Sequence, residues 1–198
     1  PVVTPDIHNR VMAEVIQPTV EGMASEGNDY TGFLYAGLMI MADGTPKVIE
    51  YNCRFGDPET QPIMMRLKSD LAEACLAVLD GRGAQVVLDW DERAAVGVVM
   101  ASGGYPLSTD TGHTMSGLAP IASDQQGDTK VFHAGTKLEN DTVINTGGRV
   151  LCVVGLGKQV TEAQRRAYAR VKEISWSGAF YRSDIGYRAI ARETREEA

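Results

Sequence analysis

The stretch KVIEYNCRFGDPETQ, residues 47–61, decides how the rest of the chain is interpreted. Its first half alternates in character, which predicts a β-strand with two different faces. One face would carry the less polar side chains, Ile49, Tyr51 and Cys53, and we expect the Cys53 thiol to be a small buried group there. The other face would carry a carboxylate, a carboxamide and a guanidinium, from Glu50, Asn52 and Arg54. Neighbours in this polar row would lie about 6–7 Å apart.

The segment that precedes this stretch is strongly apolar. Residues 31–41 read TGFLYAGLMIM, which is too short to span a membrane and too apolar for a half-exposed strand. We therefore expect a central strand that is buried on both faces. Residues 43–46, DGTP, predict a hairpin turn. Residues 47–52 should then return antiparallel to the apolar strand.

Helices are expected on both sides of these two strands in the sequence. Thr4 is a suitable N-cap for a helix whose first residue is Pro5. Pro18 should kink or interrupt this helix before it stops near residues 27–29, GND. A second helix is expected after the polar stretch, capped at residues 69–70, SD.

The second half of the chain has a different character. Three segments favour strands, namely AAVGVVMAS, KVFHAGTKL and RVLCVVGLG, and glycine-rich turns separate them. A helix should begin at Thr161, and another short helix should follow near the end of the sequence. We place a domain boundary within the charged segment 91–93, which gives one domain over residues 1–92 and a second over residues 93–198. The expected fold class is α+β, with an antiparallel sheet and covering helices followed by a small β-rich α+β domain.

Composition excludes several classes of protein. The chain has 198 residues with 43% hydrophobic and 23% charged content, as in ordinary globular proteins. Its net charge of −7 argues against a general nucleic-acid or anionic membrane surface. The three cysteines are far apart, so they fit a reducing cytoplasm and have no metal-binding spacing. The opening residues, PVVTPDIHNR, contain no methionine or targeting pattern, and we expect a piece of a longer protein.

The polar row on the predicted strand is suited to a magnesium–nucleotide complex. A carboxylate beside an apolar strand is unfavourable unless a cation or hydrogen bonds compensate it. Oxygen atoms of Glu50 and Asn52 can reach one cation together, and Mg²⁺ prefers such ligands and takes others from nucleotide phosphates. Arg54, one step along, can bind a phosphate oxygen. The alternative is an exposed strand face with a solvated ion pair, and spacing alone favours this alternative, because rows of charged side chains usually lie on the surface.

The turn after the strand also has two interpretations. Asp57 can cap a helix that starts at Pro58, with Glu59 in its first turn. Alternatively, Asp57 binds an amine of a substrate, and both roles are compatible. A second glycine-rich turn, SGGYP at residues 102–106, resembles a phosphate-binding loop, but we favour a simple turn after a strand.

Two motifs carry a resemblance to known enzymes. The sequence Glu50-Tyr51-Asn52-Cys53-Arg54 resembles the E-x-N-x-R element of the ATP-grasp superfamily, and its extension RFGDPETQP resembles the signature of the phosphoribosylamine–glycine ligase family (glycinamide ribonucleotide synthetases). Other segments are similar to the same family, namely YTGFLYAGLMI, DERAAVGVVMASGGYP, KVFHAGTKL and DIGYRAIAR. The resemblance covers essentially the whole chain.

The resemblance implies roles for five residues. Glu50 and Asn52 match the family's metal ligands, for Mg²⁺ or Mn²⁺ with bound ATP, and Arg54 matches the arginine that stabilises phosphate charge. Asp57 matches a loop that faces the acceptor substrates. Leu38 is a candidate for one wall of the adenine pocket, although we favour a plain core position for it. The preceding strand lacks the further acidic ligand found in many ATP-grasp enzymes.

The implied reaction joins glycine to 5-phosphoribosylamine at the expense of ATP, through glycyl phosphate, in purine biosynthesis. The resemblance also implies that the chain holds the second ATP-grasp lobe and the family's C-terminal domain, and we expect it to be inactive without the first lobe. Expected partners are small molecules only, with no nucleic acid and no membrane, and the full-length protein should be a cytoplasmic monomer. The alternatives are another ATP-grasp carboxylase or ligase, and a non-catalytic binding or interaction module.

Overall fold

The computed structural model describes residues 3–118 and 125–196, which form two compact units. The first unit contains the residues up to Asp57 together with Leu67–Asp89. The second unit contains Pro58–Arg66 and the residues from Trp90 onward. Within the described part of the chain, no helix is both long enough and apolar enough to cross a membrane.

The first unit is built on an antiparallel hairpin. Strand β1 (Tyr35–Ile40) pairs with β2 (Pro46–Asn52). Gly44 has a φ of +80°, which favours glycine, and the Thr45 amide donates to Asp43 Oδ1 at 2.9 Å. The predicted turn and antiparallel return are confirmed.

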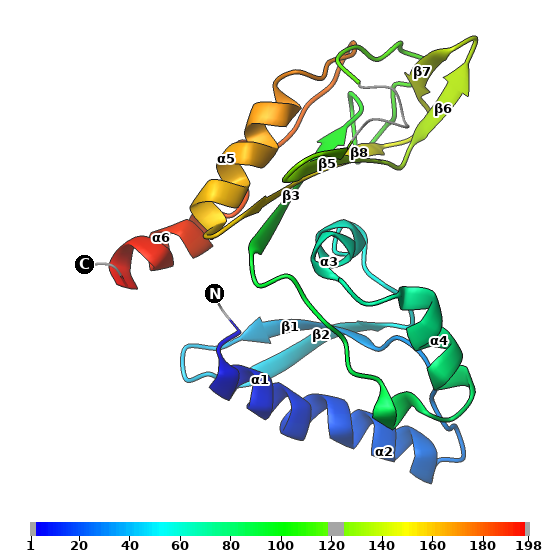
Figure 1. The fold of residues 1–198 in the computed structure, drawn as a ribbon, viewed down its shortest axis with the longest axis vertical. Coiled ribbons are helices and arrows are strands. Elements are labelled where there is room, and N and C mark those ends of the chain that lie inside the picture. Colours follow the sequence, from blue (N-terminus) through cyan, green and yellow to red (C-terminus); the bar gives the residue numbers. More distant parts are fainter. Residues whose placement is uncertain (1–2, 119–124, 197–198) are drawn as a thin grey trace. The chain divides into compact units, whose positions relative to one another are not determined.

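A long helical segment runs along one face of this hairpin (Figure 1). It consists of α1 (Pro5–Val11), a π-helical segment η1 (Met12–Ile16) and α2 (Gln17–Ser25). Thr4 caps its start, since its Oγ1 accepts from the Ile7 amide at 3.3 Å. The prediction that Pro18 interrupts the regular α-helix is confirmed in a specific form. The chain stays helical, but it has π geometry over Met12–Ile16, in the turn that precedes Pro18, which has no N–H to donate.

The apolar strand is covered on one face, so the expectation of burial on both faces is wrong. On the covered face, Tyr51 and Thr19 share a hydrogen bond of 2.8 Å between their hydroxyl groups, and Val15 is buried. Met39 is 55% exposed and Ile49 66% exposed. The sheet has two strands within the described residues. An apolar strand shows that a covering layer is needed but not which chain segment supplies it.

The rest of the first unit is a short helix and the segment that follows it. Helix α4 (Leu71–Leu79) is capped by Asp70, whose Oδ1 accepts from the Ala72 amide at 2.7 Å and the Glu73 amide at 3.1 Å. The predicted cap is therefore confirmed. A single 3₁₀ turn, η2 (Gly83–Gln85), follows.

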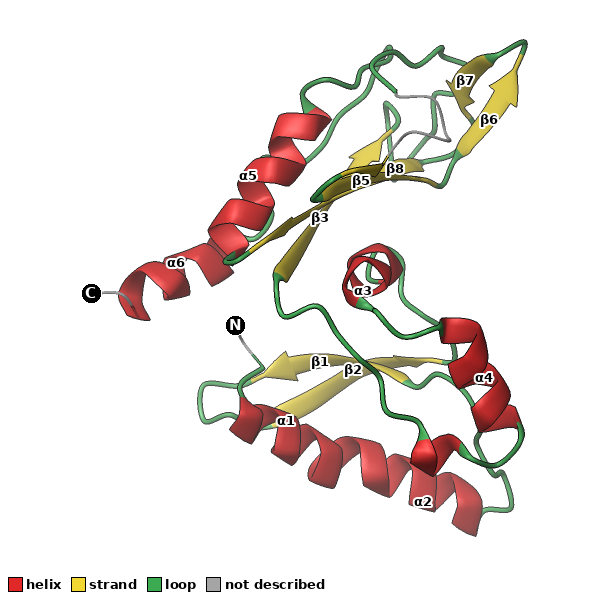
Figure 2. Cartoon of the chain, viewed as in Figure 1, coloured by secondary structure: helices red, strands yellow, loops and turns green. Residues whose placement is uncertain are grey.

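The second unit contains an antiparallel sheet of four strands in the order β3-β8-β5-β4. Their bounds are β3 (Ala94–Ala101), β4 (Gln125–Gln126), β5 (Thr129–His133) and β8 (Arg149–Gly157). A separate hairpin consists of β6 (Thr136–Glu139) and β7 (Thr142–Asn145). Its helices are α3 (Thr60–Arg66), α5 (Val160–Val171) and α6 (Tyr187–Glu196) (Figure 2). The α+β fold class is confirmed.

One predicted strand is divided in the structure. KVFHAGTKL was expected to be continuous, but β5 ends at His133 and β6 begins at Thr136. The break falls at Gly135, where a Cβ atom would lie 2.8 Å from the backbone oxygen of Arg149 and from the Cα of Gly147. Close approach of another backbone, rather than a strand, explains this glycine.

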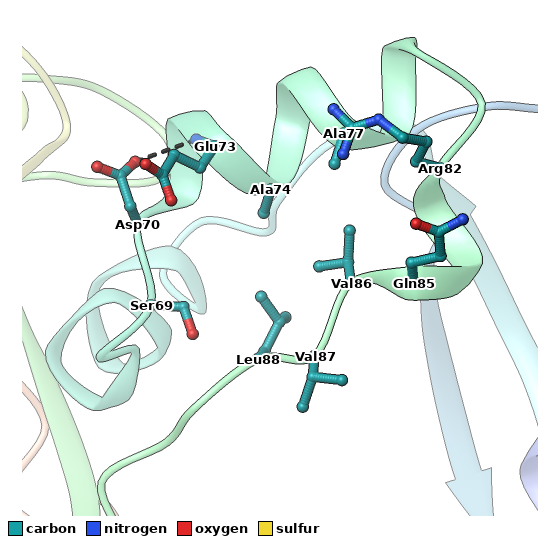
Figure 3. A pocket seen from close by; sticks show the side chains of 10 residues that line it. All are labelled: Ser69, Asp70, Glu73, Ala74, Ala77, Arg82, Gln85, Val86, Val87 and Leu88. Atoms are coloured by element: carbon teal, nitrogen blue, oxygen red, sulfur yellow. Dashed lines mark hydrogen bonds between the residues drawn. The ribbon is translucent and has the colours of Figure 1, made fainter.

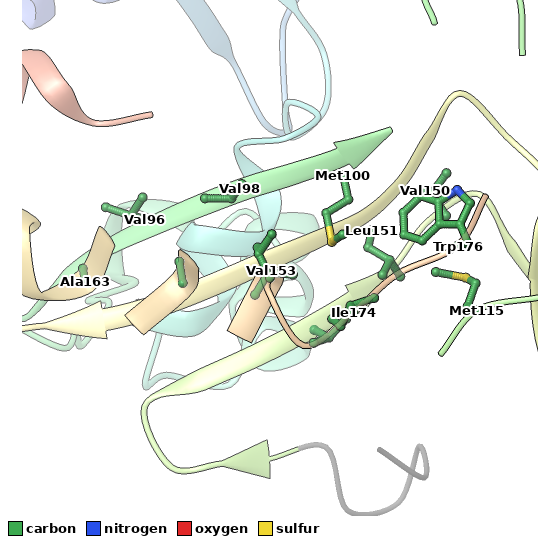
Figure 4. Packing of buried hydrophobic residues seen from close by; sticks show 13 residues of the cluster. Val96, Val98, Met100, Met115, Val150, Leu151, Val153, Ala163, Ile174 and Trp176 are labelled. Carbon is green, nitrogen blue, oxygen red and sulfur yellow. The ribbon is translucent and has the colours of Figure 1, made fainter. Parts of the chain in front are cut away.

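The core of the second unit lies between the sheet and α5 (Figure 4). Val98, Val150 and Val153 are fully buried on the strands, and Ala163, Ala167 and Val171 are fully buried on the helix. The alanines and the valine follow one another at helical spacing, so they form a single stripe along α5. Gly155 of β8 lies directly under the helix, because a Cβ there would overlap Ala163 O and lie 2.7 Å from Ala167 N.

Replacing Gly155 with alanine should therefore destabilise the protein. The added methyl group meets backbone atoms, which cannot move as a side-chain tip can, and we expect a loss of about 1–3 kcal/mol in the free energy of unfolding. Urea denaturation followed by circular dichroism measures this. Gly22→Ala in α2 is the matched control, because a Cβ there meets nothing within 4 Å; it should be neutral or stabilising. Equal effects of the two substitutions would contradict this account of the packing.

Helix α5 has an N-terminal cap that comes from a distant part of the chain. Its own N-cap residue, Gln159, makes no side-chain cap. Glu193 of α6 instead accepts from the Val160 amide at 2.7 Å and from the amide and hydroxyl groups of Thr161 at 3.1 and 3.0 Å. Burial acts to raise the pKa of Glu193, but these hydrogen bonds outweigh it and lower the pKa below its ordinary value.

Glu193→Gln should weaken the protein in a pH-dependent manner. A carboxylate with a lowered pKa in the folded state contributes stability above its unfolded pKa of about 4.3, and this contribution is lost as the pH falls through the folded value. We expect a loss of about 0.5–2 kcal/mol at pH 7, as for other helix caps, and a smaller difference near pH 4. Urea titrations at the two pH values measure it. Glu139→Gln, on an exposed strand, is the control, and a pH-independent loss would contradict the assigned role.

Candidate functional site

The pairing of β1 with β2 brings Glu50 and Asn52 together. Glu50 lies opposite Gly37, and Asn52 lies opposite Tyr35. Directly opposite residues share a face of the sheet. Asn52 Nδ2 donates to Glu50 Oε1 at 3.3 Å, so the two side chains converge as the alternation predicted.

Gly37 leaves room for the side chain of Glu50. The sequence patterns did not identify Gly37 as part of the site. A Cβ atom at residue 37 would lie 3.1 Å from Glu50 Cγ. A glycine inside an otherwise apolar strand is the signal that could have revealed this close approach. The strand opposite Glu50 thus supplies room rather than an additional acid.

The register contains a bulge next to Glu50. Gly37 pairs with Glu50 but Leu38 pairs with Val48, which leaves Ile49 as the extra residue of β2. The bulge explains the exposure of Ile49, which the simple alternation assigned to a packed face. Bulges often redirect side chains beside functional sites, and this one ends the regular pairing at Glu50.

Leu38 does not share the face of the Glu50–Asn52 pair. It follows Gly37, and successive side chains of a strand point to opposite faces. Its face also contains Ala36, which pairs with Tyr51, the residue bonded to helix α2. The register therefore favours the core alternative for Leu38, and its role beside adenine stays a prediction.

Arg54 and Asp57 lie after the end of β2, in the loop that leads to α3. Arg54 is exposed, and its Nη1 donates to Phe55 O at 2.9 Å. The Phe55 ring packs on the Phe33 ring with a centroid separation of 4.2 Å, which holds this loop against the segment before β1. No hydrogen bond joins Arg54 to Glu50 or Asn52 in the described structure, so the predicted row is a pair followed by a separate guanidinium.

The predicted helix start at Pro58 is wrong. Residues 57–59 form a turn, and α3 begins at Thr60. The Ile63 amide donates to Glu59 O at 3.2 Å, which places the start of the helical hydrogen bonding at Glu59. Asp57 is exposed in the turn, three residues before the helix.

Cys53 is exposed, so its predicted burial is also wrong. Strand β2 ends at Asn52, and the alternation no longer applies to the next residue. The Tyr30 hydroxyl donates to Phe33 O at 2.5 Å. Burial, followed by a hydrogen bond with the Cys53 thiol, raises the pKa of Tyr30.

The polar groups of the turn at residues 102–106 make hydrogen bonds within the protein. Ser102 is fully buried, its hydroxyl donates to Gly147 O at 2.7 Å, and it accepts from Asn145 Nδ2 at 2.7 Å. Asn145 also accepts from the His113 amide at 2.7 Å through Oδ1. These bonds join the turn to the loop before β8, which supports the structural interpretation over a phosphate cradle.

A hollow of about 450 Å³ lies between α4 and the segment after it (Figure 3). Its apolar lining includes Ala74, Ala77 and Val86. Its charged groups are largely engaged, because Asp70 caps α4 and Arg82 pairs with Asp80 at 2.9 Å. This hollow therefore has few polar groups that could bind a ligand.

The fold and the Glu50–Asn52 pair define a class of protein. An antiparallel hairpin backed by helices, with a carboxylate and a carboxamide converging at the end of its second strand, is the arrangement expected for the C-terminal lobe of an ATP-grasp fold. The model for the ATP-grasp (A) domain of phosphoribosylglycinamide synthetase matches residues 1–60, and the model for its C domain matches residues 95–188. The chain belongs to the phosphoribosylglycinamide synthetase family.

Individual relatives agree with the family models. The phosphoribosylamine–glycine ligase of Vibrio parahaemolyticus is 63% identical over 193 residues, and that of Allochromatium vinosum is 62% identical over 193 residues. Each alignment covers 98% of this chain and 44% of the relative, so the chain spans less than half the length of these enzymes. The crystal structure of the ligase from Thermotoga maritima superposes with a TM-score of 0.78 at 34% identity, over 93% of this chain and 44% of that one.

Proposed function

We propose that this chain is the metal-binding and phosphate-binding part of an ATP-dependent ligase that joins glycine to 5-phosphoribosylamine. The convergence of Glu50 and Asn52 on one face of the hairpin carries the proposal, because it supplies two oxygen ligands inside the family's motif. Residues 1–92 would be the second ATP-grasp lobe, and residues 93–198 the family's C-terminal domain. The three cysteines form no disulfide in the part of the chain that the structure describes, and a reducing cytoplasm is the proposed location.

The donor atoms fit a hard divalent cation, Mg²⁺ or Mn²⁺. Glu50 supplies a carboxylate, and Asn52 uses its Nδ2 for Glu50, which leaves its carbonyl oxygen for a metal. Within the described residues there is no group of three or more His, Cys, Asp or Glu side chains suited to a metal. A small ligand set matches Mg²⁺, which keeps waters and takes further ligands from nucleotide phosphates.

Arg54 would act on the phosphate that is transferred, and Asp57 would act on the acceptor amine. Arg54 uses one Nη atom for Phe55 O, and its other N–H groups remain for a phosphate oxygen. This positive charge would stabilise the negative charge that develops during phosphoryl transfer. Asp57 would orient the acceptor amine through its exposed carboxylate.

The reaction would proceed in two displacements. The glycine carboxylate attacks the γ-phosphorus of ATP, giving glycyl phosphate and ADP. The amine of 5-phosphoribosylamine then attacks the glycyl carbonyl carbon, and phosphate leaves with the electron pair of the broken C–O bond while the nitrogen loses a proton. Positioning and charge stabilisation suffice for both steps. The bound cation would neutralise phosphate charge.

Two other functions are less well supported. Another ATP-grasp carboxylase or ligase would share the Glu50–Asn52 pair but not the sequence from Gly56 to Glu59. A non-catalytic module would not explain identity above 60% to ligases over nearly all of this chain.

Glu50→Ala in a protein of the relatives' length tests the proposal. Loss of one of two metal ligands should reduce ligase turnover at least a hundredfold while the circular dichroism spectrum stays unchanged. Release of ADP in the presence of glycine and 5-phosphoribosylamine measures it. Glu73→Ala, on α4, is the control and should keep normal activity. Near-normal turnover by Glu50→Ala would refute the metal assignment, and robust turnover by the 198-residue chain alone would refute the division of the site between two lobes.

Gly37→Val tests the geometry of the same site without removing a ligand. The valine side chain would meet Glu50 Cγ and displace the carboxylate from Asn52. We expect Mn²⁺ affinity, measured by electron paramagnetic resonance in the presence of ATP, to fall at least tenfold. Ala36→Val, on the opposite face of β1, is the matched control. Unchanged Mn²⁺ binding by Gly37→Val would show that the cation is held elsewhere.

A further inference from the structure

The second unit contains a hollow that none of the roles above uses. It has a volume of about 500 Å³ and is lined by Pro62, Ile63, Arg66, Trp90 and Ala95. This volume lies within the usual range for small-molecule sites. Among the described residues that line it, Arg66 is the charged one, in a chain whose net charge is −7.

The guanidinium of Arg66 is held in place but keeps two donor nitrogens. Arg66 Nε donates to Asp91 O at 3.0 Å, and the Asp91 amide donates back to Arg66 O at 2.7 Å. The Asp91 carboxylate is bound by Arg93, with an Nη2–Oδ2 distance of 2.6 Å. Among the described residues, neither Nη atom of Arg66 has a hydrogen-bond acceptor or a carboxylate partner. An oriented guanidinium of this kind is suited to a phosphate group.

The walls of the hollow are mostly apolar. Helix α3 packs closely on the sheet, because a Cβ on Gly97 would lie 3.1 Å from Pro62 Cγ. Trp90 is 38% exposed, whereas the other tryptophan, Trp176, is 8% exposed in the core. An indole ring and aliphatic side chains offer a surface for the carbon skeleton of a ligand. By contrast, Arg82 in the hollow beside α4 is already paired with Asp80.

We propose that the hollow lined by Arg66 and Trp90 binds the 5-phosphoribosyl group of the acceptor substrate. Arg66 holds the phosphate through its two Nη atoms, and Trp90, Pro62 and Ile63 pack against the ribose. This inference rests on the proposed ligase function for the identity of the ligand. The chemistry of the hollow, one cation beside an indole ring, is independent of that function.

Fluorescence provides a direct test on the 198-residue chain. The probe is ribose 5-phosphate, and Trp90 is the reporter because Trp176 is buried. We expect saturable quenching that is absent in Trp90→Phe and shifted to at least tenfold higher concentration in Arg66→Gln. Arg82→Gln removes the same charge from the other hollow and should bind normally. Arg66→Lys keeps the charge but not the paired donors, so it should bind with intermediate affinity; it also serves if Arg66→Gln fails to fold, as judged by circular dichroism.

Other outcomes would overturn the proposal. Tighter Arg66-dependent binding of AMP than of ribose 5-phosphate would identify a nucleotide site instead of an acceptor site. Equal binding of inorganic phosphate would show a simple anion site. No quenching, or equal losses in Arg66→Gln and Arg82→Gln, would exclude a specific site.

Kinetics in a protein of the relatives' length separate this inference from the ligase assignment. Arg66→Gln should raise the KM for 5-phosphoribosylamine at least tenfold and leave the KM values for ATP and glycine within about twofold. An unchanged KM for 5-phosphoribosylamine in an active ligase would overturn the inference alone. Absence of ligase activity in the unmodified protein would refute the proposed function, and the fluorescence result would still decide whether the hollow binds a phosphoribosyl group.

Discussion

The register between β1 and β2 determines what this part of the protein can do. It places Glu50 opposite Gly37 and Asn52 opposite Tyr35, on the face of the hairpin opposite to the one that contacts α2. The bulge at Ile49 changes the register, so this pairing holds only for the last residues of β2, from Glu50 to Asn52. A shift by one residue would turn both oxygen donors toward α2 and the Tyr51 ring toward solvent. The hydrogen bond between Tyr51 and Thr19 opposes such a shift, since it attaches the other face of the strand to the helix.

Local signals in the sequence predicted much of this arrangement. Thr4, Pro18 and Asp70 act locally, through a cap or a missing N–H, and all three have the predicted effect on their helices. The alternation also predicted the convergence of Glu50 and Asn52, because strand geometry alone determines it. The family resemblance extended these local predictions to the whole chain.

The errors have a common physical cause. Ile49 and Cys53 were assigned to a packed face by alternation, but a bulge and the end of a strand depend on the partner strand and on the loop that follows. The break at Gly135 depends on the backbone of Arg149 and Gly147, which lies more than ten residues away in the sequence. Arg66 and Trp90 belong to separate segments of the sequence, and backbone hydrogen bonds from the Lys68 amide to Asp89 O and from the Asp91 amide to Arg66 O bring these segments together.

The cap that Glu193 provides has a consequence for folding during synthesis. The carboxylate lies 33 residues beyond Val160, the amide that it binds. At about 5–20 residues per second, a ribosome needs roughly 2–7 s to add that length of chain. Until Glu193 is available, the first amides of α5 lack the cap that they have in the folded protein. The nascent chain should therefore hold α5 with a frayed first turn until α6 emerges and closes it.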